Sequence, residues 1–79
     1  MKYYHNNKLY ISTDELSRTF TRDYGFYVSP YNINRLCFHY HIPHLKRNNM
    51  NFFYLNMLSQ TRQMNTTFME YLKKIIIDS

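Results

Sequence analysis

Residues 29–55 constrain the fold most, because they carry the signals for one helix and one hairpin in direct succession. Ser29 followed by Pro30 is typical of a helix start. The serine side chain can accept from free backbone N–H groups, and proline already has a helical φ at the first position. Pro43 is expected to end this helix. An apolar stripe at spacing i, i+3, i+4 and i+7 predicts its buried side, formed by Ile33, Leu36, Cys37 and Tyr40.

The residues after Pro43 predict a short β-hairpin. Residues 45–47 form the expected first strand and residues 50–55 the returning strand. Asn48 and Asn49 lie between them, and asparagine is a common turn residue. The hairpin therefore carries a polar, basic tip.

A second helix is predicted over residues 13–24, preceded by a short strand that ends at Ile11. Ser12 and Glu15 have the spacing of a capping box, in which each side chain bonds to the other's backbone. Gly25 is the expected left-handed residue after the helix.

Three segments are expected: a flexible N-terminus over 1–8, a folded unit over 9–58 and an amphipathic C-terminal helix over 59–79. Thr67 and Glu70 would form a second capping box near the start of the apolar part. Its stripe could pack on the same domain, or bind a partner protein or a second copy. The four stripe residues are Phe68, Leu72, Ile75 and Ile76.

The charge balance favours a polyanionic partner. The chain has 79 residues, enough for one domain, and ten Lys and Arg against five Asp and Glu give a net charge of +5. The single cysteine rules out an internal disulfide framework and fits a reducing compartment. There is no signal-peptide core and no apolar run long enough for a bilayer, so we expect a cytoplasmic protein without a membrane segment.

The order of these signals resembles the small excisionase and MerR-type winged helix-turn-helix DNA-binding domains. The resemblance covers roughly residues 9–58 and rests on ISTDELSRTF, the G-F-Y turn, VSPYNINRLC, HIP and a Lys/Arg/Asn-rich turn before FFYL. It implies an α+β fold that is mainly helical with a small hairpin. It also implies a second helix in the major groove, a wing along the DNA backbone, and cooperative binding to repeated sites. A phage or mobile-element role follows from it, as a recombination directionality factor or a transcriptional regulator.

The candidate DNA contacts follow from the outward side of the helix over 30–41. Arg35 leads them, because a guanidinium can bond to both O6 and N7 of guanine. Around it we expect Tyr31, Asn32, Asn34, Phe38 and His39. Phosphate contacts are expected from the hairpin tip and the first helix, through Lys46, Arg47, Asn48, Asn49, Arg18 and Arg22.

Catalysis and metal binding are not favoured. The acids are scattered, Gly25 is the only glycine, and no nucleophile with a base can be placed, so we expect neither an enzyme nor a cofactor. Cys37 and His41 have an i, i+4 spacing that can share a zinc ion. Because Cys37 also completes the apolar stripe, a buried, inert thiol is the preferred interpretation.

Two other functions stay open. One is a small phage-encoded inhibitor of a host or defence enzyme, for example an anti-CRISPR, acting through its tyrosines and C-terminal helix. The other is a single-stranded nucleic-acid-binding factor for replication, whose rings stack on bases. Alternate strand residues share a face, so we expect Phe52 and Tyr54 to point inward. The candidate stacking rings are Tyr31, Phe38, Phe52, Phe53 and Tyr54.

Overall fold

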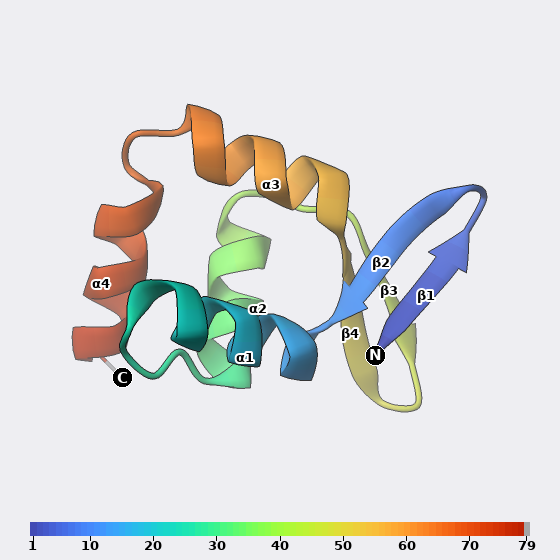
Figure 1. The fold of residues 1–79 in the computed structure, drawn as a ribbon, viewed down its shortest axis with the longest axis horizontal. Helices are drawn as coiled ribbons and strands as arrows, with labels where there is room; N and C mark the ends of the chain where they lie inside the picture. The colour runs from blue at the N-terminus through green and yellow to red at the C-terminus, as the bar shows by residue number, and fades with distance from the viewer. Residues whose placement is uncertain (79) are drawn as a thin grey trace.

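The computed structural model describes residues 1–78, which form four strands and four helices in the order β1–β2–α1–α2–β3–β4–α3–α4 (Figure 1). The α+β class expected from the sequence is confirmed. The strands are β1 (Lys2–His5), β2 (Lys8–Ser12), β3 (His44–Arg47) and β4 (Met50–Tyr54). The helices are α1 (Thr13–Tyr24), α2 (Pro30–His39), α3 (Leu55–Met64) and α4 (Phe68–Asp78).

The strands form one antiparallel sheet in the order β1-β2-β4-β3, built from two hairpins. Both hairpins turn on two asparagines with positive φ, Asn6 and Asn7 in the first and Asn48 and Asn49 in the second. Two-residue hairpin turns need this left-handed conformation, and asparagine adopts it more readily than most residues. The expectation of a flexible N-terminus over residues 1–8 is wrong, because the first turn pairs β1 with β2.

Alternation along β4 sends neighbouring aromatic residues to opposite faces of the sheet. Phe53 pairs with Ile11 of β2, and both lie in the main core with residues from all four helices. Phe52 and Tyr54 point to the other face, so the prediction that they face the helical core is wrong. In Figure 1 all four helices lie on the left of the sheet, which is the Phe53 side.

The predicted helix starts are confirmed, with one difference in the capping box. The Ser12 hydroxyl accepts from the Glu15 backbone, Ser29 caps α2 in the same way, and Gly25 has φ 76°. The Glu15 carboxylate does not complete the box. It accepts from the N-terminal amine of Met1 at 3.0 Å, and this hydrogen bond lowers the pKa of Glu15.

The expected single helix over 59–79 is two helices, α3 and α4, joined by residues 65–67. The Thr67 backbone N–H and hydroxyl both donate to the side-chain carbonyl of Asn65, so this hydroxyl forms a hydrogen bond within the linker. The apolar stripe of α4 packs on the same domain, which was one of the two interpretations of its pattern. Its buried members, at 2% exposure or less, are Phe68, Leu72 and Ile75.

We expect Leu72→Ala to destabilise the fold by about 2–5 kcal/mol, because it removes a fully buried side chain and leaves a cavity. The matched change on the same helix is Ile77→Ala, where the side chain is 80% exposed. It should change the free energy of unfolding by less than about 0.5 kcal/mol. Urea denaturation followed by circular dichroism measures both. Equal, small effects would contradict the packing of α4 on the core.

Candidate nucleic-acid interface

The outward side of α2 carries four of the predicted contact residues. Tyr31 is 64% exposed, and the Arg35 guanidinium lies 5.8 Å from the centre of its ring. Asn34 and Arg35 are half-buried, and Phe38 is 43% exposed. Since Ile33, Leu36 and Cys37 are fully buried on the opposite side, this helix separates a core stripe from an open one.

One hydrogen bond and two ring contacts join this side of α2 to the β3–β4 hairpin. The Asn51 side-chain amide donates to the Asn34 side-chain carbonyl at 3.1 Å. The Phe38 ring meets the rings of His44 and Phe53 edge-on, with centroids 5.0 and 5.4 Å apart. Helix and hairpin therefore present one continuous surface.

Lys46 and Arg47 do not act from the same side of the hairpin. Lys46 pairs with Asn51, so it shares the side that contacts α2. Arg47 pairs with Met50 and points to the other face of the sheet. The exposed turn residues Asn48 and Asn49 lie beyond both. We call the following residues the α2–hairpin surface: Tyr31, Asn34, Arg35, Phe38, Lys46 and Asn51.

Two predicted base contacts are not part of this surface. Asn32 is only 5% exposed, so its placement on the outer side of the helix is wrong. It lies four residues before Leu36, which puts it beside the buried stripe. Its side-chain carbonyl finds no hydrogen-bond partner among residues 1–78. The His39 ring is exposed, but it stacks on Tyr71 of α4 with centroids 3.8 Å apart.

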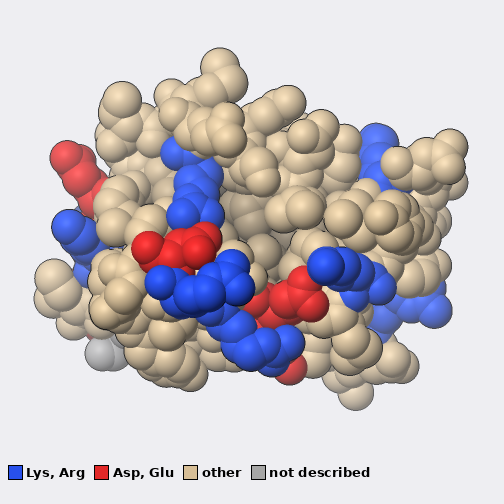
Figure 2. All heavy atoms as spheres, in the orientation of Figure 1, with Lys and Arg blue, Asp and Glu red and all other residues tan. Residues whose placement is uncertain are grey.

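Arg18 and Arg22 are exposed on α1, in surroundings of mixed charge. Arg22 lies 3.4 Å from Asp23, which also pairs with Arg62 of α3 at 3.3 Å. Figure 2 shows basic and acidic side chains interleaved over α1. This face is less suited to a polyanion than its arginines alone suggest.

The acidic residues are distributed unevenly along the chain. All five lie before residue 24 or after residue 69, within α1 and α4. The chain between them forms α2, β3, β4 and α3, and it carries four Lys or Arg and three His without one carboxylate. The α2–hairpin surface therefore combines positive charge with hydrogen-bonding and aromatic groups, and no acid of its own opposes an anion.

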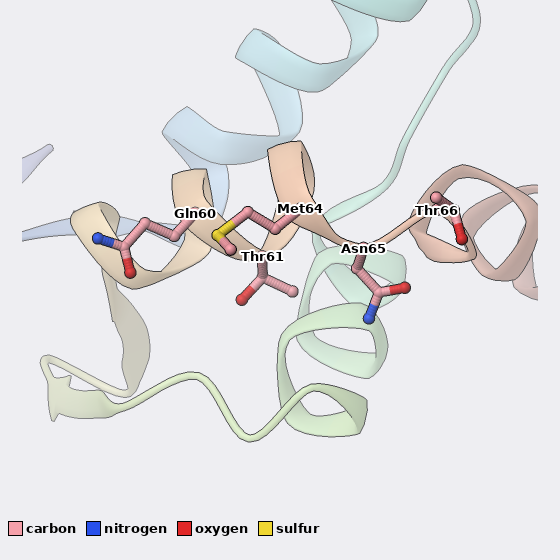
Figure 3. Close-up of a pocket in the computed structure, with 5 residues that line it drawn as sticks. All are labelled: Gln60, Thr61, Met64, Asn65 and Thr66. Carbon is pink, nitrogen blue, oxygen red and sulfur yellow. The ribbon is translucent and has the colours of Figure 1, made fainter.

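Two hollows of the surface lie outside the α2–hairpin surface. Figure 3 shows one at the end of α3, around Met64 and Asn65, lined by uncharged side chains. A more apolar hollow lies between the turn after α1 and the end of α4, formed by Phe26, Tyr27, Lys73, Ile76 and Ile77. Of the four predicted partner-binding residues, Ile76 alone lines it, and Ile76 also packs against the core.

The two residues of the candidate zinc pair lie in different environments. Cys37 is fully buried, and burial raises the pKa of its thiol, whereas His41 is exposed after the end of α2. No group of three or more His, Cys, Asp or Glu side chains within residues 1–78 is arranged to hold a metal ion.

The sequence did not point to Asn51 or to the aromatic residues of β1 as candidate functional residues. Asn51 bridges helix and hairpin, which only the register of β4 determines. The rings of β1 had a usable signal, because Asn6 and Asn7 repeat the turn at Asn48 and Asn49.

Comparison with protein-family models, with curated proteins and with solved structures finds no match to this chain. Within residues 1–78, every helix falls short of the length and apolar character that crossing a bilayer requires.

We expect Cys37 to resist thiol reagents in the folded protein, because burial excludes the reagent and disfavours the reactive thiolate. Ellman's reagent at pH 8 should give almost no colour in buffer and one thiol per chain in denaturant. Rapid, complete reaction of the folded protein would contradict the burial of this side chain.

Proposed function

We propose that this protein is a winged helix-turn-helix that binds double-stranded DNA, with α2 as the recognition helix and the β3–β4 hairpin as the wing. The observation that carries the proposal is the acid-free α2–hairpin surface, held together by the hydrogen bond between Asn34 and Asn51. A basic face of this kind on a small domain is what a polyanion recognises.

The dimensions of α2 suit this role. The helix has 10 residues, so it is about 15 Å long, and its diameter with side chains, about 10–12 Å, fits a major groove about 12 Å wide. Arg35 would bond to a guanine edge. The Tyr31 ring beside it restricts the guanidinium, which lowers the entropy lost on binding. Lys46 would contact a backbone phosphate next to the groove.

The biological setting rests on the resemblance alone. It favours a phage or mobile-element protein that directs recombination as an excisionase does, or regulates transcription. Binding as a homodimer, or cooperatively at repeated sites, belongs to the same proposal.

The inhibitor alternative has less support. It relied on the tyrosines and on the C-terminal helix, and Phe68, Leu72 and Ile75 of the apolar stripe of that helix are buried in the chain's own core. These three side chains are therefore not free to bind a partner protein.

Lys46→Ala should weaken binding to all duplexes and reduce the slope of log K against log salt by about 1, because one phosphate contact is lost. Lys74→Ala is the charge-matched control, since Lys74 is an exposed lysine of α4, a helix that contributes no residue to this surface. Fluorescence anisotropy on a random duplex at several salt concentrations measures both. Equal slopes for the two variants would contradict a phosphate contact by Lys46, and with it the role of the β3–β4 hairpin as a wing.

Arg35→Ala should lower sequence preference by about 1–3 kcal/mol at one base pair, because a bidentate contact to a base is lost. Selection of duplexes from a random pool, with wild type and variant in parallel, identifies that position. An unchanged selected motif would mean that α2 does not read the bases.

A further inference from the structure

The face of the sheet that points away from the helices has a composition of its own. Cross-strand partners share a face, and the pairs Tyr3–Tyr10, His5–Lys8, Tyr10–Tyr54, Leu45–Phe52 and Arg47–Met50 all lie on this one. We call it the outer sheet face. Among the elements formed by residues 1–78, no helix lies over this side in Figure 1.

Five rings of the outer sheet face form one contact chain. Tyr10 and Phe52 are 7% and 5% exposed, yet neither belongs to the main core. Both rings are in contact with neighbouring rings of the same face. Centroid distances are 6.5 Å for Tyr3 to Phe52, 6.3 Å for Tyr3 to His5, 6.5 Å for His5 to Tyr10 and 5.6 Å for Tyr10 to Tyr54. His5 is exposed, and Tyr3 and Tyr54 are half-buried. The rings thus form one aromatic cluster, and its outer members are accessible.

Two cations lie over this aromatic cluster. The Arg47 guanidinium is 4.1 Å from the centre of the Tyr3 ring, and the Lys8 ammonium is 5.4 Å from that of Tyr54. Both side chains belong to exposed residues on strands without any acid. Positive charge is therefore held beside stacking surfaces, and no carboxylate among the paired residues neutralises it.

We propose that the outer sheet face binds single-stranded nucleic acid, with Tyr3, His5 and Tyr54 stacking on bases and Lys8 and Arg47 bonding to phosphates. Aromatic rings interleaved with cations match the two parts of such a strand, its base planes and its backbone charges. A duplex is a poorer occupant, since its bases are already stacked on each other and expose only their edges.

This site is independent of the proposed duplex-binding surface. Lys46 and Arg47 are neighbours that point to opposite sides of the hairpin, so each surface has its own cation. The two ligands would not compete for side chains. Loss of one activity therefore leaves the other available for measurement.

The test uses the full chain with fluorescein-labelled oligo(dT), oligo(U) and a random DNA duplex, followed by anisotropy. Tyr3→Ala should weaken single-strand binding about tenfold, which corresponds to one stacked base, and leave duplex binding unchanged. The matched control is Tyr4→Ala, since Tyr4 is 71% exposed on the same strand and points to the opposite face. It should leave single-strand binding unchanged. The DNA and RNA oligomers show which sugar the site prefers.

Arg47→Ala should reduce the salt dependence of single-strand binding, and Lys46→Ala should not. His5→Ala is a second ring variant at an exposed position, and circular dichroism establishes that each variant is folded. The proposal is overturned if the wild type binds neither oligomer. It is equally overturned if Tyr3→Ala and Tyr4→Ala lose binding alike, or if Lys46 rather than Arg47 carries the salt dependence. None of these results decides whether the protein binds duplex DNA, which the separate measurement with the duplex tests.

Discussion

The burial of Phe53 is the contact on which the rest of the arrangement depends. Its ring lies in the main core, its strand neighbours are Ile11 and His44, and it meets Phe38 of α2 edge-on. These contacts set the register of β4. The register in turn places Asn51 and Lys46 on the side of α2 and Phe52 and Arg47 on the other. A slip of one residue would exchange the two faces, because side chains alternate along a strand.

Local signals made much of the fold predictable. The caps at Ser12 and Ser29, the left-handed Gly25 and the turn at Asn48 are each decided by a few neighbouring residues, and each is found where expected. Failures occurred where distant parts of the chain decide. The side of β4 that faces the helices depends on pairing with β2, some forty residues earlier, and no local pattern reports it.

The candidate site was predictable to a similar degree. Tyr31, Asn34, Arg35 and Phe38 lie on the expected side of α2, because the period of a helix is regular. Asn32 was misplaced because it lies at the margin of the buried stripe, where helical periodicity alone does not determine whether a side chain is buried or exposed. The separation of Lys46 from Arg47 required the sheet register, and so did the joining of the rings of β1 to those of β4.

The strand order has a consequence for self-association. The sheet is open, and its edges are β1 and β3, each only four residues long. Unpaired strand edges invite further chains to add to them, and short strands rich in cations discourage it. Lys2 lies on one edge, and Lys46 and Arg47 lie on the other. We therefore expect these basic side chains to discourage copies of the protein from extending one another's sheets, and neutral replacements there to increase aggregation.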